Sequence, residues 1–249
     1  MTDKPTVLVP LQVLEGESIP EGVPALLSGA SVMILGYHVL PEQTATEQGR
    51  EQFGERAMNR LTEFEEMVSS AGADVETRLV FTHEAQQTIN RVLVEEDCFA
   101  VLIPKATPPV EEVLVPVRGT VGRERLVRVL ASLFADTDAT ITLFHVEQPE
   151  ETDETIRTLL GDLEAALVEA GIEGENVLKQ VVTGEKPLEA ITTAAEHTDV
   201  VVMGETDPSV ATFVFGLPEE QLADEFLGPV LIVQRPPPEQ EGTEAPGQD

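Results

Sequence analysis

The sequence predicts an α/β fold made of two Rossmann-like, doubly wound parallel-sheet domains in tandem. Short runs of Val, Leu and Ile alternate with amphipathic helical segments, a pattern typical of a parallel sheet that helices cover on both faces. Three of these apolar runs also recur in the same order at a nearly constant offset, which indicates a duplicated unit. The recurring runs are VLVP at 7–10 and 113–116, SVMILGYHV at 31–39 with TITLFHV at 140–146, and AVLIP at 100–104 with VVVMG at 200–204.

The first repeat, residues 1–108, is predicted to be truncated, with four strands and no fifth. Pro20 and Pro24 follow the first strand, so its first helix must be short or start late. Only residues 105–112 separate the fourth strand from the next VLVP run, which leaves no room for another helix and strand. The expected strands are 5–10, 31–40, 74–81 and 99–104, and the expected long helices are 45–72 and 83–97.

The second repeat, residues 109–235, is predicted to be complete, with five strands. Residues 123–134 place Leu and Val at helical spacing, Gly171 suits the position after a helix end, and Pro187 suits a first helical turn. The Pro- and Glu-rich tail at 236–249 is expected to be disordered. The expected strands are 110–117, 138–146, 176–184, 199–204 and 228–234, with helices at 123–134, 153–171, 186–198 and 218–226.

The net charge of −31 restricts the partners of the chain. It carries 46 Asp and Glu residues against 15 Lys and Arg, and this acidity disfavours nucleic acid and anionic lipid as partners. Two interpretations of the acidity are open, an ordinary solvated surface and adaptation to a high-salt cytoplasm, where salt screens the carboxylates. With only four Lys residues, the composition favours the halophilic interpretation.

The cysteine content and the hydropathy pattern exclude further classes. Cys98 is the only cysteine, so a disulfide framework and a cysteine metal site are excluded, and it is expected to be a small buried hydrophobe. The N-terminus lacks the pattern of a signal peptide, and no uninterrupted apolar run reaches the length of a membrane span. We therefore expect a cytoplasmic protein without membrane insertion.

The order of motifs in the second repeat resembles the universal stress protein family. The motifs are VLVPV at 113–117, HV at 145–146, GEKPLEAI at 184–191, DVVVMG at 199–204 and GPVLIV at 228–233, and three of them are echoed in the first repeat. The resemblance covers nearly all of the chain before residue 236 and is to a tandem member. It implies HUP-type sheets of order 3-2-1-4-5, with a ligand crevice at the carboxyl ends of strands 1 and 4.

Many members of that family bind ATP through a glycine motif after the fourth strand. The motif is Gly, two residues, Gly, nine residues, then Gly-Ser or Gly-Thr, with an Asp just after the first strand. Glycines allow the backbone to approach phosphates, and amides at a helix start face the anion.

The chain departs from this motif at most positions. Gly204 matches the first glycine, Asp207 stands at the second, and Gly216 takes the third one residue early, which puts Leu217 at the hydroxyl position and Pro218 after it. Between Gly204 and Gln234 there are six acidic residues and no Lys or Arg, which disfavours phosphate.

The resemblance therefore predicts a vestigial nucleotide site in the second repeat. Arg118 replaces the Asp after the first strand, and the first repeat is expected to be inert. No cofactor is expected to bind firmly, and ATP or AMP is expected to bind weakly, no better than about millimolar. The predicted site residues are Pro116, Val117, Arg118, Val146, Met203, Gly204, Asp207, Gly216 and Leu217.

The arginine cluster Arg118, Arg123, Arg125 and Arg128 has two interpretations. It can form an anion pocket that replaces the lost loop, or it can pair with neighbouring acids. In so acidic a chain the second interpretation is favoured. The expected acids are Glu111, Glu112 and Glu124.

The histidines are predicted to be structural. His38 and His145 end equivalent strands and suggest a zinc pair, but no third ligand lies near either in the sequence. No Ser-His-Asp or Cys-His arrangement is evident, and Ser209 has no base nearby, so no catalytic residue and no metal site is expected.

The predicted function is that of a non-enzymatic stress-response, regulatory or interaction module with a degenerate nucleotide site. Two alternatives remain open. The first is an ATP- or AMP-binding member with a divergent loop, and the second, by analogy with the family, is a soluble regulatory partner of a membrane transporter. The partner is an unknown protein, and self-association is also possible.

Overall fold

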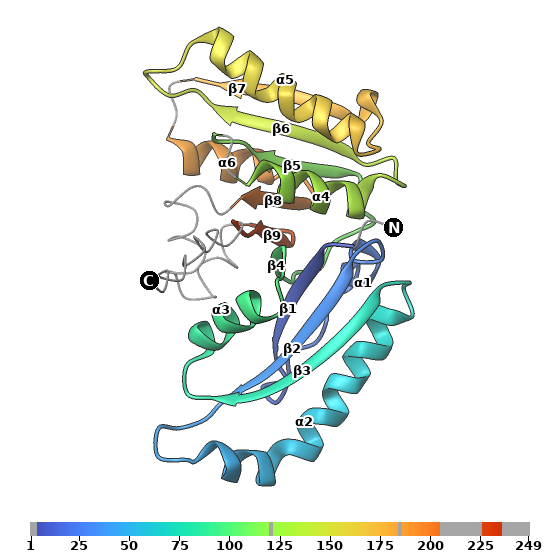
Figure 1. Ribbon diagram of the computed structural model, residues 1–249, viewed down its shortest axis with the longest axis vertical. Coiled ribbons are helices and arrows are strands. Elements are labelled where there is room, and N and C mark those ends of the chain that lie inside the picture. The colour runs from blue at the N-terminus through green and yellow to red at the C-terminus, as the bar shows by residue number, and fades with distance from the viewer. Residues whose placement is uncertain (1–3, 120–121, 184–185, 205–225, 236–249) are drawn as a thin grey trace, which may run out of the picture.

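The computed structural model describes residues 4–119, 122–183, 186–204 and 226–235, and its strands form one nine-stranded sheet (Figure 1). The strand order is β3-β2-β1-β4-β9-β8-β5-β6-β7. The first half contains β1 (Thr6–Gln12), α1 (Val23–Leu26), β2 (Ser31–Val39), α2 (Thr46–Ser69), β3 (Asp74–Thr82), α3 (Ala85–Glu95) and β4 (Ala100–Ile103). The second half contains β5 (Glu112–Pro116), α4 (Arg123–Phe134), β6 (Thr140–Val146), α5 (Asp153–Glu169), the 3₁₀ helix η1 (Gly174–Asn176), β7 (Val177–Val182), α6 (Pro187–Ala195), β8 (Val200–Gly204) and β9 (Val230–Val233).

The predicted fold class is confirmed. The order β7-β6-β5-β8-β9 is the 3-2-1-4-5 order, and every pair in it is parallel. The first half follows the same order for four strands, β3-β2-β1-β4, and its described residues contain no fifth. Its first helix is four residues long with Pro24 in the first turn, as the two prolines predicted.

The junction between the two halves was not predicted. The last strand, β9, pairs in parallel with β8 and antiparallel with β4, where Ala100 lies opposite Val233 and Ile103 opposite Val230. A parallel neighbour for β4 would need a crossover of a dozen or more residues, and β5 follows β4 too soon for one. The exposed edge of β4 is therefore covered by the other half.

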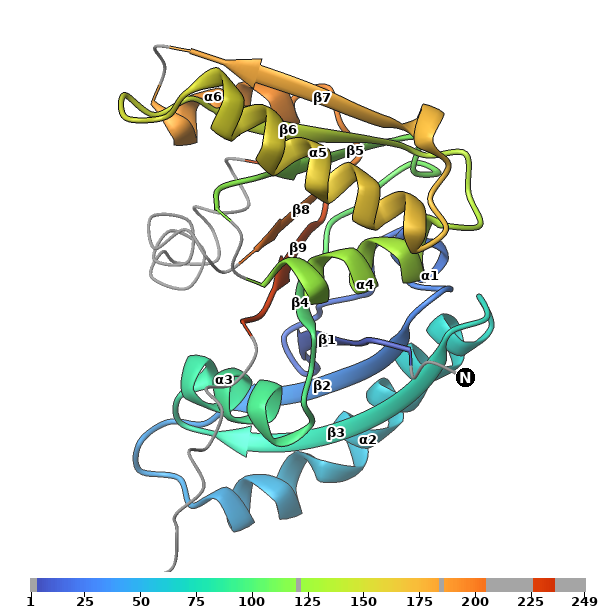
Figure 2. The same cartoon turned by 45° about the horizontal axis from the view of Figure 1, so that its top comes forward.

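Helices cover both faces of this sheet, and the two halves share one core on each face (Figure 2). Helices α1, α2, α4 and α5 contribute to one cluster of buried residues, while α3 and α6 contribute to the other. Along β5, Val113 and Val115 lie in the first cluster and Leu114 in the second, as expected for alternating sides of a strand. The division of the chain between residues 108 and 109 remains a prediction, because both clusters contain residues of both halves.

Several local predictions are also confirmed. Gly171 follows α5 with a φ of +106°, and Pro187 is the first residue of α6. Cys98 is buried, and burial raises the pKa of its thiol to about 12.

Two predictions lie outside the described residues. The predicted helix at 218–226 falls almost entirely outside them, and the tail at 236–249 falls entirely outside them. Among the helices that the structure describes, none has the length and apolar character that crossing a membrane requires.

Candidate functional site

The candidate site lies at the carboxyl ends of β5 and β8. Strand β5 lies between β6 and β8, so the connections on its two sides lead in opposite directions across the sheet. Ligand crevices of open α/β sheets form at such a point. Two small cavities of about 30 Å³ each occupy it, and both are lined by Pro116, Val117, Arg118 and Gly204.

The first, which we call the α6-side cavity, contains the predicted site residues that the structure describes. Pro116, Val117, Arg118, Val146, Met203 and Gly204 all line it. The sequence analysis missed its remaining walls, which come from the β6 end, the following turn and α6. These walls are Phe144, Gln148, Pro187 and Ile191. The other predicted residues, Asp207, Gly216 and Leu217, lie outside the described residues.

The second, which we call the α4-side cavity, lies on the other face of β5. Most of its lining was not predicted, although the anion-pocket interpretation of the arginine cluster included Arg118 and Arg123, which line it. Besides the four shared residues, its lining comes from the start of α4, from α5 and from the residues after β9. The available signal was the VRGTVGRER stretch at 117–125, where glycines alternate with arginines. The additional lining residues are Gly119, Gly122, Arg123, Leu126, Leu159, Leu163, Val233, Gln234 and Arg235.

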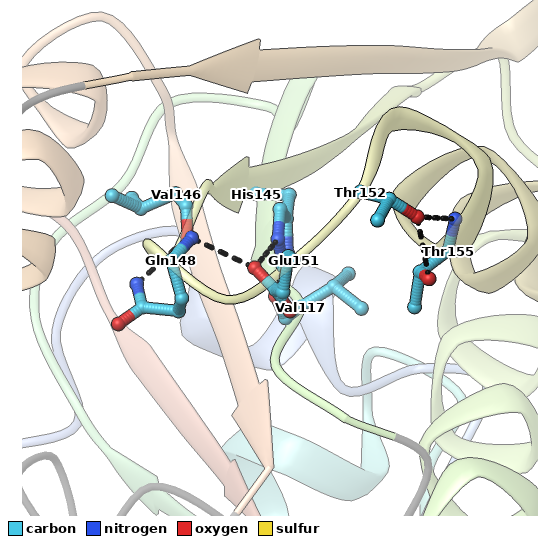
Figure 3. A network of polar contacts seen from close by, with 7 residues as sticks. All are labelled: Val117, His145, Val146, Gln148, Glu151, Thr152 and Thr155. Atoms are coloured by element: carbon cyan, nitrogen blue, oxygen red, sulfur yellow. Dashed lines mark hydrogen bonds and ion pairs between the residues drawn. The ribbon is translucent and has the colours of Figure 1, made fainter.

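A polar network built on the buried His145 links the end of β6 and the following turn to the β5 exit (Figure 3). His145 is fully buried, with Nδ1 2.8 Å from the Val117 carbonyl oxygen and Nε2 2.9 Å from Glu151 Oε2. The same Glu151 oxygen accepts the Gln148 backbone N–H at 2.8 Å, and the Gln148 side chain donates to the Val146 carbonyl at 2.9 Å. Since a carbonyl only accepts, Nδ1 of His145 must carry a proton. The structural interpretation of His145 is thereby confirmed.

The charge of Glu151 is stabilised by this network. Burial by itself would raise the pKa of the Glu151 carboxyl, but the Gln148 N–H, the hydrogen bond and charge of His145 and the charge of Arg118 outweigh it. The pKa of Glu151 is therefore held below its ordinary value. Thr152, which accepts the Thr155 N–H at 3.2 Å, caps α5 immediately after it.

His38, the equivalent residue of the first half, has different surroundings. Its ring packs edge-on against Phe53 and Phe81, with centroid separations of 5.4 and 6.1 Å. Within the described part of the chain, no group of three or more His, Cys, Asp or Glu side chains is arranged to hold a metal ion.

The arginine cluster divides between two environments. Arg125 pairs with Asp97 at 2.7 Å, and the guanidinium groups of Arg125 and Arg128 each lie 4.4 Å from the centre of the Phe99 ring. Arg123 pairs with Asp162 at 3.5 Å. Ion pairing is confirmed for Arg123 and Arg125, but with acids distant in sequence. For these two arginines the partners in the structure differ from the examples Glu111, Glu112 and Glu124, because helix α4 directs Arg125 toward the first half and Arg123 toward α5.

A model of the universal stress protein family matches residues 109–234. The chain belongs to the universal stress protein family. The match spans the second half, where the five strands and both cavities lie. A comparison with curated proteins finds no match.

A solved universal stress protein shares the fold of this family member over nearly its whole length. The protein from Archaeoglobus fulgidus DSM 4304 is 15% identical in sequence and has a TM-score of 0.63. The alignment covers 94% of this chain and 97% of the Archaeoglobus chain. The cytoplasmic domain of a prokaryotic cation chloride cotransporter is 13% identical in sequence and has a TM-score of 0.50. The alignment covers 92% of this chain and 95% of the cotransporter domain. A universal stress protein in complex with cAMP is 19% identical over 51% of this chain and 98% of its own, with a score of 0.40. At these identities the likeness concerns the fold alone.

The α6-side cavity has apolar walls and a small enclosed volume. Val117, Phe144, Val146, Ile191 and Met203 form apolar walls. Its volume of about 30 Å³ corresponds to roughly two water molecules, whereas small-molecule sites usually enclose ~300–1,000 Å³.

Proposed function

We propose that this chain is a non-enzymatic regulatory or interaction module of the universal stress protein family, with a degenerate nucleotide site. The observation that carries the proposal is the crevice itself. It lies where the family fold places a ligand, yet the α6-side cavity measures only about 30 Å³. The departures from the glycine motif at Asp207, Leu217 and Pro218 support the same proposal from the sequence.

The state of the two most reactive side chains near the core supports a role without catalysis. A general base needs a nitrogen that is available to a substrate, but both ring nitrogens of His145 are engaged inside the protein. A cysteine nucleophile needs a lowered pKa, whereas that of the buried Cys98 is raised to about 12. We therefore place the function in binding rather than in turnover.

An ATP- or AMP-binding member with a divergent loop is the first alternative. The apolar walls of the α6-side cavity favour it, because they would suit an adenine ring if they moved apart. The second alternative is a regulatory partner of a membrane transporter in the cytoplasm. It is suggested by the fold shared with the cotransporter domain, and affinity capture of a defined transporter from solubilised membranes would test it.

Calorimetric titration of ATP in molar KCl tests the degenerate site. We expect the unchanged chain to bind no better than about millimolar, near −4.1 kcal/mol. A triple variant that combines Asp207→Gly, Leu217→Ser and Pro218→Val restores two positions of the glycine motif and one backbone N–H donor. If these three residues alone account for the lost affinity, the triple variant should bind ATP at least about tenfold more tightly. Micromolar binding by the unchanged chain would contradict the proposal and favour the first alternative.

A further inference from the structure

The described lining of the α4-side cavity is basic in an acidic chain, although the carboxylates of Glu151 and Asp162 lie near Arg118 and Arg123. Three of its described lining residues are arginines, Arg118, Arg123 and Arg235, and none is Asp or Glu. The chain as a whole carries 46 acidic residues and a net charge of −31. Three guanidinium groups from three separate segments therefore border one small cavity whose described walls contribute no carboxylate.

The ion pair that holds Arg123 leaves it able to exchange partners. Its distance to Asp162 is 3.5 Å, and the two side chains are 41% and 59% exposed. Exposed pairs of this kind contribute little free energy, because water solvates both charges almost as well. An oxyanion inside the cavity can therefore compete for the Arg123 guanidinium.

The glycines beside the arginines leave open space around the backbone. Gly119 and Gly122 have φ angles of +73° and +75°, and a Cβ added to either would meet no atom within 4 Å. Gly122 precedes the twelve-residue helix α4, whose first turn has no side-chain cap. Its first N–H groups and the helix dipole add to the field of the arginines, which remain the main attraction.

The size of the cavity selects a small ligand. A volume of about 30 Å³ holds roughly two water molecules, so among phosphate-class ligands only a small oxyanion approaches this size, and a nucleotide far exceeds it. Leu126, Leu159 and Leu163 supply apolar walls that lower the local dielectric and strengthen charged hydrogen bonds. Guanidinium groups suit such a ligand because they bind phosphate oxygens in a bidentate manner.

We propose that Arg118, Arg123 and Arg235 form a binding site for a small oxyanion of the phosphate class at the carboxyl end of β5. The anion is either free phosphate or the phosphoryl end of a larger ligand that extends over Val117 into the α6-side cavity. The inference extends the proposed function. It rests on the degenerate nucleotide site for one expectation, that a nucleoside attached to the phosphate adds little binding affinity. It gives the crevice a ligand that does not depend on the lost glycine motif.

Calorimetric titrations of inorganic phosphate, adenosine and ATP at constant ionic strength test the site. We expect saturable phosphate binding, no adenosine binding, and ATP affinity within a few fold of that for phosphate. Arg123→Ala should weaken phosphate binding about tenfold, equivalent to ~1.4 kcal/mol. The matched control is Arg91→Ala, because Arg91 likewise has one exposed ion pair, at 3.7 Å to Glu95, but lies on α3 in the first half. It should bind phosphate as the unchanged chain does.

Asp162→Asn provides a test in the opposite direction. It removes the competing carboxylate from Arg123 and should tighten phosphate binding by a few fold. The proposal is overturned if phosphate does not bind, if Arg123→Ala and Arg91→Ala bind it equally well, or if Asp162→Asn weakens binding as much as Arg123→Ala does. Micromolar ATP affinity that is insensitive to Arg123→Ala would instead overturn the degenerate nucleotide site.

Discussion

At the scale of single residues, the hydrogen bonds of His145 determine the geometry of the β5 exit. Both ring nitrogens face acceptor oxygens, the carbonyl of Val117 at 2.8 Å and the carboxyl of Glu151 at 2.9 Å. Val117 lines both cavities, so the network connects the crevice to the turn before α5. Removing one member would leave a buried polar group without its partner, which costs more free energy than the bond contributes when present.

Glu151→Gln should reduce stability in a pH-dependent way. At neutral pH we expect a loss of about 1–2 kcal/mol in the free energy of unfolding, because the amide replaces a charged acceptor by a neutral one. The pKa of Glu151 is lower in the folded chain than its ordinary value of 4.5. The contribution is therefore complete above that ordinary value and is lost as the pH falls through the lowered pKa.

Urea denaturation of the variant and the unchanged chain over a series of pH values measures this difference. Glu150→Gln is the control, because Glu150 is an exposed neighbour and its replacement removes the same charge. If the two variants lose stability in parallel at every pH, the network does not stabilise the folded state.

At the scale of elements, the contact between the residues after α1 and helix α4 joins the two halves. A Cβ added to Gly29 would lie 1.9 Å from the Ser132 carbonyl oxygen, and the Ser132 hydroxyl donates to the Gly29 carbonyl at 2.7 Å. The close approach of the two backbones therefore requires glycine. Together with the pairing of β9 with β4, it makes the first half depend on elements of the second.

Gly29→Ala should consequently destabilise the protein by roughly 1–3 kcal/mol, because the methyl group can be accommodated only if the backbone shifts. Gly161→Ala is a matched substitution whose effect on stability should have the opposite sign. Gly161 lies inside α5 with open space around it, so alanine should stabilise the helix by ~1 kcal/mol. Thermal or urea unfolding of both variants gives the comparison. Equal stability of Gly29→Ala and the unchanged chain would show that the α1–α4 contact is loose.

At the scale of the whole molecule, the charge of −31 is the main feature of the surface. Like charges repel in the folded state, where they are closest together, and salt screens this repulsion within ~10 Å at 0.1 M and ~3 Å at 1 M. The described ion pairs are mostly exposed and offset little of it.

The melting temperature should therefore rise between low salt and molar KCl. Differential scanning calorimetry over a KCl series measures the effect, with sucrose as a control for changes that do not act through charge. A melting temperature that stays flat or falls across the series would contradict adaptation to high salt.

The sequence by itself predicted the order of strands and helices and the strand ends at which the candidate site lies. These follow from local patterns, since apolar periodicity and residues such as Pro24, Gly171 and Pro187 act on their own segment of chain. It also identified Pro116, Val117, Val146, Met203 and Gly204 together, because the carboxyl ends of parallel strands meet at one edge.

Tertiary structure alone decided which elements meet across the two halves. Nothing in VLIV at 230–233 indicates that β9 pairs with β4 as well as β8, because both edges of a buried strand offer the same backbone groups. The partners of Arg123 and Arg125 are likewise distant in sequence, Asp162 and Asp97, and the α4-side cavity combines segments from α4, α5 and the end of β9. Such contacts depend on the free energy of packing the whole chain, which no short stretch of sequence contains.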